Sequence, residues 1–216
     1  TGRQGGPGNG GFPDARKGWV PFAFMKASKL HKKNAYDLVI TTGPPHSVHS
    51  IGIRLTRKYP DLFWLADFRD PLSELYYLGN KVDHRNISLE KKILNTADAI
   101  LTIGPSLKKL LQEKINIDRK SNVHYIYNGF DAIKFKNIKR IEPNQFTLAQ
   151  VGLIADSYPF DEFCNALEAF CSKINTQIRF ILAGNICERF LYKLEKINNL
   201  KVEYLGFVTH RRSLEI

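Results

Sequence analysis

Apolar residues gather in short runs along the first half of the chain, and a segment with helical periodicity follows each run. Residues 38–40 form an apolar run typical of a strand covered on both faces, and the strand ends at Gly43 and Pro44. Apolar positions then recur at intervals of three and four, which predicts a helix capped by Ser47. Residues 62–66 predict a second buried strand, which leads directly into the charged segment 67–70.

The same plan continues further along this half. Residues 98–103 predict a third strand, preceded by a helix over residues 87–96 and followed by a Gly-Pro-Ser loop and another amphipathic helix. Residues 123–127 predict a fourth short strand. Repeated strand, loop and helix units favour a parallel sheet with helical crossovers.

A second α/β series follows a polar, basic connector. Its predicted strands are residues 146–152, 178–184 and 201–206, and its predicted helices are residues 160–174 and 188–197. Each strand is predicted to end in glycine. Gly152, Gly184 and Gly206 would let a ligand approach the backbone at one edge of the sheet, although glycine also ends strands for steric reasons alone.

These elements predict an α/β protein with two Rossmann-like parallel-sheet domains, both incomplete. Residues 1–128 would form an N-terminal domain that lacks its first strand, and residues 145–216 a partial C-terminal domain. Residues 129–144 would be the connector between them. Because the chain starts without methionine and without a first strand, we expect it to be a segment of a longer protein.

The composition is that of a soluble globular protein. With 216 residues and 43% hydrophobic content, the chain can build a packed core. No apolar run approaches the roughly 20 residues that span a bilayer, and no signal-peptide pattern opens the chain, so we predict a cytoplasmic location. The three cysteines lack metal-ligand spacing and are predicted to be buried, reduced thiols.

Positive charge is concentrated in the first half. The net charge is +11, and residues 1–128 carry 20 Lys and Arg against 11 Asp and Glu, whereas residues 129–216 carry 12 against 10. Residues 24–33 place lysines beside an apolar stripe, as a helix lying against a core or an anionic membrane surface would. The alternative is a solvated helix face.

Four motifs occur in order along the chain and carry a resemblance. They are Thr41-Thr42-Gly43-Pro44-Pro45-His46-Ser47, Ala66-Asp67-Phe68-Arg69-Asp70-Pro71, Asn128-Gly129-Phe130-Asp131 and Leu205-Gly206-Phe207-Val208-Thr209-His210. Together they resemble the GT-B-type retaining glycosyltransferases of the family-four group, and within it a bacterial subgroup active in cell-surface polysaccharide assembly. The resemblance implies transfer from a nucleotide-diphosphate sugar without a metal or other cofactor.

The resemblance also implies that the two domains bind different substrates. The N-terminal domain would bind the acceptor, and the C-terminal domain would bind the nucleotide-sugar donor, with Gly152, Gly184 and Gly206 beside it. The acceptor would be a saccharide or a lipid-linked molecule in polysaccharide or lipopolysaccharide biosynthesis. The basic first half fits such an acceptor at an anionic inner membrane face, where the enzyme would be peripheral, and no nucleic-acid partner is expected.

Carried over by position, the second motif and the histidine of the first would act in catalysis. Asp67 or Asp70 would orient the acceptor hydroxyl or accept its proton, and Arg69 would hold an anionic group or a neighbouring carboxylate. His46 would hydrogen-bond a sugar hydroxyl near the anomeric centre.

The loop of the first motif is predicted to meet the donor diphosphate. Gly43 and Pro44 precede a helix capped by Ser47, so free backbone N–H groups and the positive end of the helix dipole would face the phosphates.

Each of these residues has a structural alternative. Asp67, Arg69 and Asp70 could form a buried ion-pair network that ties the strand end to a neighbouring helix. His46 could satisfy loop carbonyls. His49 lies on the predicted polar side of its helix and is expected to be structural or exposed.

Two other functions stay open at this point: a basic nucleic-acid-binding or scaffold protein with a Rossmann-like core, and a GT-B nucleotide-sugar epimerase. Against nucleic-acid binding, the aromatic residues fall within apolar strands or at their edges. The family's opening strand, its C-terminal acidic motif and a basic residue within residues 152–157 have no counterpart here. We therefore expect these 216 residues alone to be inactive.

Overall fold

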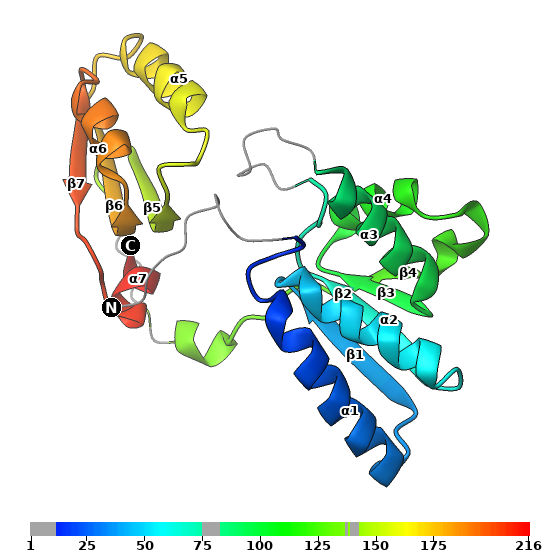
Figure 1. Ribbon diagram of the computed structural model, residues 1–216. Coiled ribbons are helices and arrows are strands. Elements are labelled where there is room, and N and C mark those ends of the chain that lie inside the picture. The colour runs from blue at the N-terminus through cyan, green and yellow to red at the C-terminus, as the bar shows by residue number, and fades with distance from the viewer. Residues whose placement is uncertain (1–11, 75–82, 137, 139–142) are drawn as a thin grey trace. The chain divides into compact units, whose positions relative to one another are not determined.

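The computed structural model describes residues 12–74, 83–136, 138 and 143–216 (Figure 1). The chain divides into two compact units, Thr1–Gly129 and Phe130–Ile216. The predicted connector 129–144 lies partly outside the described residues.

The first unit is built on a four-stranded parallel sheet. Its strands are β1 (Leu38–Gly43), β2 (Phe63–Phe68), β3 (Ala99–Thr102) and β4 (Val123–Tyr125), in the order β1-β2-β3-β4. In the register between β1 and β2, Thr42 lies opposite Asp67. Because all four strands are parallel, the polar residues that follow them collect at one edge of the sheet.

Helices cover one face of this sheet. They are α1 (Val20–Asn34), α2 (His49–Lys58), α3 (His84–Thr96) and α4 (Pro105–Lys114), with single 3₁₀ segments η1 (Lys17–Trp19), η2 (His46–Val48) and η4 (Ile117–Asn122). Figure 1 shows α1 and α2 side by side. Trp64 is fully buried in the main core, and a Cβ at Gly52 of α2 would lie 2.1 Å from its ring. Only a glycine lets α2 approach the sheet this closely.

The opposite face of β1 is exposed, so the prediction of a strand covered on both faces is wrong. Leu38 and Ile40 are 46% and 55% exposed. The strands follow one another in chain order, and right-handed crossovers then place all the connecting helices on the same side of the sheet.

The apolar side of helix α1, which contains the basic segment 24–33, packs against a core of the protein. Phe24 and Ala27 pack against a small core that contains Val20, Ile51 and Leu55, so the predicted stripe faces α2 at these two positions. Leu30, the third member of the stripe, is 38% exposed instead. No helix among the described residues has the length and apolar content that would carry it through a bilayer.

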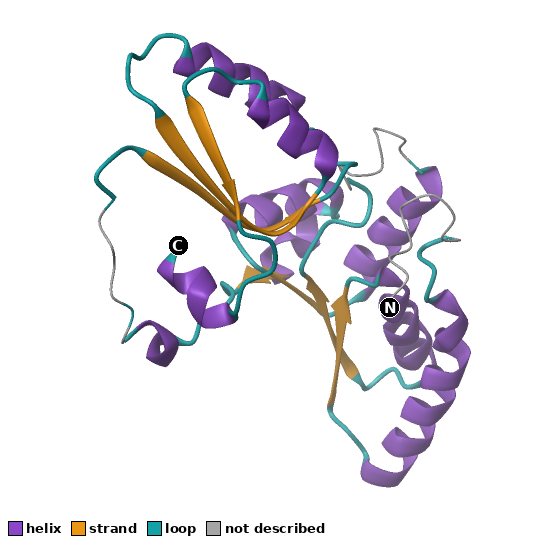
Figure 2. Cartoon of the chain, turned by 90° about the vertical axis from the view of Figure 1, so that its left-hand side faces the viewer, coloured by secondary structure: helices purple, strands orange, loops and turns teal. Residues whose placement is uncertain are grey.

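The second unit holds a three-stranded parallel sheet in the order β5-β6-β7. Its elements are η5 (Ala132–Phe135), β5 (Thr147–Ile154), α5 (Asp161–Cys171), β6 (Ile178–Ile186), α6 (Glu188–Glu195), β7 (Leu200–Tyr204) and α7 (His210–Glu215). Phe180 and Leu182 of β6 share one core with Cys164 of α5 and Phe190 of α6, so both helices lie on the same face of this sheet (Figure 2).

The three cysteines of this unit are free thiols, and the predicted burial holds for two of them. Cys164 and Cys171 are buried and Cys187 is half-buried. Burial raises the pKa of both Cys164 and Cys171, so these thiols stay protonated and unreactive at neutral pH.

The glycines of the second sheet do not end their strands, which corrects the prediction. Gly152 and Gly184 lie within β5 and β6 and pair with each other, and Gly206 lies beyond the end of β7. Gly184 has a φ of +117°, and a Cβ there would lie 2.0 Å from the carbonyl oxygen of Gly152. Its N–H donates to the carbonyl of Gly206 at 2.7 Å. Close approach of three backbone segments therefore accounts for glycine at 184.

Candidate functional site

The carboxyl edge of the first sheet brings two predicted segments together. Gly43, the last residue of β1, lies opposite Phe68, the last residue of β2. Just beyond the end of β2, Arg69 N donates to the carbonyl of Gly43 at 3.0 Å. The Gly-Pro-Pro loop and the charged segment 67–70 therefore start from one anchored point.

Two buried histidines pack under this edge. His46, in η2, is 4% exposed, and His49, the first residue of α2, is 0% exposed. The His49 ring stacks on Phe68 with 4.7 Å between ring centroids, and the His46 ring lies 5.7 Å from Phe68. The prediction that His49 lies on the polar side of its helix is wrong. At the first position of α2, the ring packs on Phe68 of β2 and is buried, so the residue is structural.

A short hydrogen-bond chain fixes the His49 ring. Trp64 Nε1 donates to Thr41 Oγ1 at 2.8 Å, and Thr41 Oγ1 lies 2.8 Å from His49 Nδ1. Because the hydroxyl already accepts from the indole, its own proton is available for Nδ1, which favours the tautomer of His49 with its proton on Nε2. That Nε2 atom is buried without a hydrogen-bond partner among the described residues.

Both imidazoles are held neutral. Burial lowers the pKa of His49 to about 3, and the nearby His46 adds to the effect. Burial also lowers the pKa of His46, although the carboxylates of Glu90, Asp70 and Asp14 act in the opposite direction. Neither His46 ring nitrogen has a hydrogen-bond partner among the described residues. The alternative in which His46 satisfies loop carbonyls is therefore not met here.

Gly43 is required by this histidine pair. A Cβ at position 43 would lie 2.8 Å from His49 Nε2 and 2.9 Å from His46 Nδ1. Both rings are buried and cannot swing away at low cost. The glycine of the first motif thus has a packing role, and its predicted contact with the donor stays a prediction. Pro44, next to it, is exposed.

Asp67, Arg69 and Asn128 form a polar group on the same edge. Asp67 is 6% exposed, and its Oδ2 lies 3.7 Å from Arg69 Nη1. Arg69 Nη2 donates to Asn128 Oδ1 in the loop after β4. Asp67 Oδ1 is buried without a hydrogen-bond partner among the described residues, and Asp70 is exposed.

This group only partly matches the structural alternative of a buried ion-pair network. Arg69 ties the strand end to a loop and not to a helix, and its side chain is 45% exposed. Asn128 was not predicted as a site residue. Its position directly after the fourth predicted strand is the signal that could have found it.

Ser47 does not cap a helix, which corrects another prediction. It lies inside η2, and the residue before α2 is Val48, which makes no side-chain cap. Ser47 N donates to Asp14 Oδ2 at 2.7 Å, and Ser47 Oγ donates to Asp14 Oδ1 at 3.0 Å. The N–H group predicted to be free for a phosphate therefore already binds a carboxylate.

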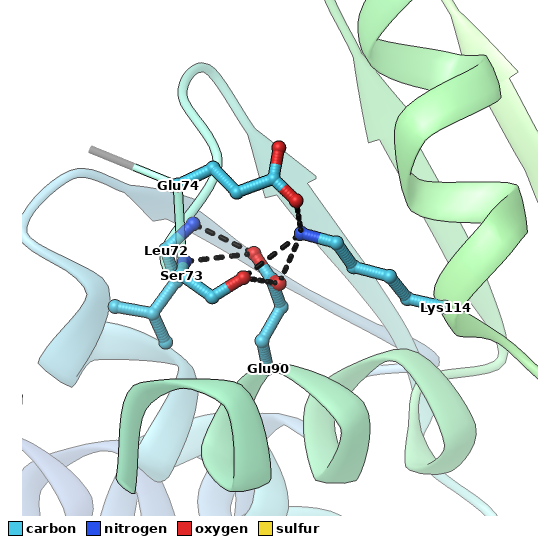
Figure 3. Close-up of polar contacts among 5 residues, drawn as sticks. All are labelled: Leu72, Ser73, Glu74, Glu90 and Lys114. Carbon is cyan, nitrogen blue, oxygen red and sulfur yellow. Dashed lines mark hydrogen bonds and ion pairs between the residues drawn. The ribbon is translucent and has the colours of Figure 1, made fainter. Parts of the chain in front are cut away.

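A second polar cluster lies just beyond Asp70 and was not predicted (Figure 3). Glu90 of α3 accepts hydrogen bonds from Leu72 N at 2.7 Å, Ser73 N at 3.3 Å and Ser73 Oγ. Lys114 Nζ of α4 lies 2.8 Å from the Glu90 carboxylate and 3.0 Å from that of Glu74. The sequence signal was a carboxylate on the apolar stripe of its helix, three residues before Ile93.

In the second unit, a basic side chain reaches the loop after β5. Arg189 Nε lies 3.1 Å from Asp156 Oδ1, and the guanidinium lies 4.5 Å from the centroid of the Phe160 ring. A basic residue was expected within residues 152–157, whereas Arg189 comes from the start of α6, more than 30 residues further along the chain.

Comparison with known proteins identifies the family. The model of Glycosyltransferase Family 4 matches residues 3–133, more than half of the chain. The chain belongs to this family. The resemblance noted in the sequence is confirmed at the level of the family.

A solved structure extends the likeness to the fold of this family-4 domain. The crystal structure of Anabaena Alr3699/HepE in complex with UDP and glucose matches with a TM-score of 0.56 at 14% identity, over 88% of this chain and 51% of that one. The chain therefore spans about half the length of the protein it matches. The GT-B-like α/β fold with two parallel sheets is confirmed. None of the curated proteins compared matches the chain.

Several of the predicted site residues of this chain fall into separate groups. His46 packs with His49 and Phe68, whereas Asp67 and Arg69 join Asn128. Both groups lie within the matched residues 3–133. Gly152, Gly184 and Gly206 lie outside that match, in the second unit. No hydrogen bond joins the His46 ring to Asp67 in the part of the chain that the structure describes.

Proposed function

We propose that this family-4 domain takes part in transferring a sugar from a nucleotide-diphosphate donor to a saccharide or lipid-linked acceptor, with retention of configuration. The observation that carries the proposal is a pair of buried residues at one sheet edge, His46 and Asp67, with polar atoms that lack hydrogen-bond partners among the described residues. Leaving such atoms unpaired costs about 1–3 kcal/mol each, and the hydroxyls of a bound sugar would pair them.

The side chains of this edge suit the charges of the reaction. Transfer develops positive charge on the sugar ring and negative charge on the departing phosphate. The neutral His46 imidazole can donate to or accept from a sugar hydroxyl. Asp70 is an exposed carboxylate that can orient an acceptor hydroxyl or take its proton, with Asp67 as the other candidate. Arg69, already on Asp67 and Asn128, would hold an anionic group or keep the carboxylate oriented.

The donor is the nucleotide-diphosphate sugar. The crystal structure of HepE was solved with UDP and glucose, which supports a nucleotide-sugar donor. The diphosphate would approach Gly43, Pro44 and Ser47 only after the Asp14 carboxylate leaves the Ser47 N–H. Gly152, Gly184 and Gly206 are proposed to lie beside the donor in the second unit.

We place the reaction in the assembly of bacterial cell-surface polysaccharide or lipopolysaccharide, with the enzyme in the cytoplasm and peripheral at the inner membrane face. Support comes from exposed lysines on α1, among them Lys26, Lys29 and Lys33. Lysines near an anionic leaflet contribute on the order of 1 kcal/mol each. Family membership favours transfer over a nucleic-acid-binding or scaffold role.

The test is a binding screen with UDP-, GDP- and ADP-sugars, followed by transfer assays, on the native full-length protein and its Asp67→Ala and Asp70→Ala variants. We expect one nucleotide class to bind, and transfer to fall at least about 100-fold in one of the variants. The matched control is Asp61→Ala, an exposed carboxylate before β2 at the other end of the strand. Normal transfer in both site variants would show that the site assignment is wrong, and an absence of nucleotide-sugar binding would refute the function.

A further inference from the structure

A buried carboxylate holds the chain directly after Asp70. The Glu90 side chain is 1% exposed and accepts from the backbone N–H groups of two successive residues, Leu72 at 2.7 Å and Ser73 at 3.3 Å (Figure 3). It also accepts from Ser73 Oγ. Two adjacent backbone amides directed at one carboxylate fix the path of the chain as well as its distance from α3.

Lys114 completes this cluster from α4. Its Nζ lies 2.8 Å from the carboxylate of Glu90, 2.8 Å from Ser73 Oγ and 3.0 Å from Glu74. Burial alone would lower the pKa of Lys114, but the hydrogen bonds and charges of Glu90 and Glu74 outweigh it and raise the pKa. Apolar side chains could pack α3 against α4 equally well. The pair of Glu90 and Lys114 differs from apolar packing because Glu90 also forms directional hydrogen bonds with the backbone after β2.

The loop that Glu90 holds is the segment after β2, and it carries Asp70, the candidate carboxylate of the site. On one side, Arg69 N is bound to the carbonyl of Gly43 at 3.0 Å, and on the other, Leu72 N is bound to Glu90. Only Asp70 and Pro71 lie between these anchors, and the ring of Pro71 fixes its own φ. The two anchors thus set the backbone position of Asp70, from which its carboxylate extends into solvent.

The same carboxylate also acts on the histidine of the site. Among the charges that raise the pKa of His46, Glu90 comes first, ahead of Asp70 and Asp14, while burial acts against all three. His49 is a further titratable neighbour of His46, with 5.7 Å between the ring centroids. One buried residue therefore influences both the backbone beside Asp70 and the charge balance around His46.

We propose that Glu90, held by Lys114, is a positioning residue of the candidate site: it fixes the exit of β2 so that Asp70 meets the acceptor. This role rests on the proposed function. Glu90 itself touches neither donor nor acceptor. Its removal should leave donor affinity in place and impair the chemical step, because a misplacement of about 1 Å can cost on the order of 100-fold in rate.

Glu90→Gln is the variant that tests this, with Glu113→Gln on the outer side of α4 as the matched control. Glutamine keeps one acceptor oxygen and loses the charge that holds Lys114. We expect kcat to fall about 10- to 100-fold, with KM for the nucleotide sugar changed by less than about threefold. Glu90→Asp keeps the charge but shortens its reach, and should show a similar loss. Unchanged kcat in both Glu90 variants would overturn the proposal.

Two readouts separate positioning from simple loss of fold, and neither needs sugar transfer. Hydrogen exchange at the Leu72 and Ser73 amides should accelerate at least about tenfold more in Glu90→Gln than exchange in the core of β2. The pKa of His46, followed by NMR, should fall further in this variant and stay constant in Glu113→Gln. If the native protein transfers no sugar while both readouts change, the proposed function fails, but Glu90 still fixes the exit of β2. If both readouts stay unchanged, Glu90 does not fix the exit of β2 and the proposal fails.

Discussion

Two buried polar clusters of the first unit lie only a few residues apart in the chain but differ in how their polar atoms are satisfied. In the cluster around Glu90, the carboxylate binds two backbone amides, a hydroxyl and an ammonium group. At the carboxyl edge of the sheet, both ring nitrogens of His46 and one oxygen of Asp67, which belongs to a neighbouring group, lack hydrogen-bond partners among the described residues. Partners within the fold satisfy the first cluster, whereas these atoms of His46 and Asp67 have none among the described residues, which is why we propose them as part of a ligand site.

The comparison predicts that apolar substitution lowers stability by very different amounts in the two clusters, and the largest loss is expected at Glu90. Glu90→Leu should lower the free energy of unfolding by about 3–5 kcal/mol, because it leaves Lys114 and two backbone amides without their partner. Urea denaturation measures this change. Adding Lys114→Leu should restore part of the loss, since the charge is then removed as well. A cost below about 1 kcal/mol in the single variant would mean that the cluster is not structural.

A smaller effect concerns His49, whose pKa of about 3 lies below its ordinary value of 6.5. Between these two pH values the unfolded chain binds more protons than the folded one, so stability rises with pH and is lost as the pH falls from 6.5 toward 3. The slope is at most about 1.4 kcal/mol per pH unit. His49→Gln should flatten the curve of unfolding free energy measured from pH 4 to pH 7. His84→Gln, at an exposed position, serves as the control, and equal slopes in both variants would contradict a buried neutral His49.

The smallest expected change in stability belongs to His46. His46→Phe should change the free energy of unfolding by less than about 1 kcal/mol, because an apolar ring replaces one whose nitrogens make no hydrogen bonds with the described residues. Sugar transfer should still fall about 100-fold if the ring meets the substrate. Thermal denaturation and a transfer assay on the same samples make the comparison. A large loss of stability would place His46 with Glu90 as a structural residue.

The edge on which both clusters lie could be predicted from the sequence. Apolar runs that end in Gly43 and before Asp67 were sufficient to place these residues at strand ends, because the period of apolar positions is a local property. The family resemblance, carried by motifs in a fixed order, is confirmed by the match over residues 3–133. The roles given to the individual site residues stay predictions.

The predictions made from the sequence were wrong where the structure depends on residues that are distant in the chain. The apolar run of β1 did not reveal that its outer face is exposed, since this depends on the order of the strands and the hand of the crossovers. Ser47 has the chemistry of a helix cap, yet Asp14, 33 residues earlier, takes its N–H and hydroxyl. Gly184 was expected to end a strand, but it lies within β6, where the backbone of Gly152 comes too close for a side chain at position 184.

By itself, the sequence determined the elements, their parallel arrangement and the family, because periodicity and motif order are written in neighbouring residues. Only the tertiary structure decided which polar groups would be satisfied. Glu90 meets residues 17 and 18 positions away, Lys114 meets it from 24 positions away, and Arg69 meets Asn128 across 59. Such contacts form when packing brings separate elements together, and no local pattern specifies which buried carboxylate gains partners and which keeps an oxygen free.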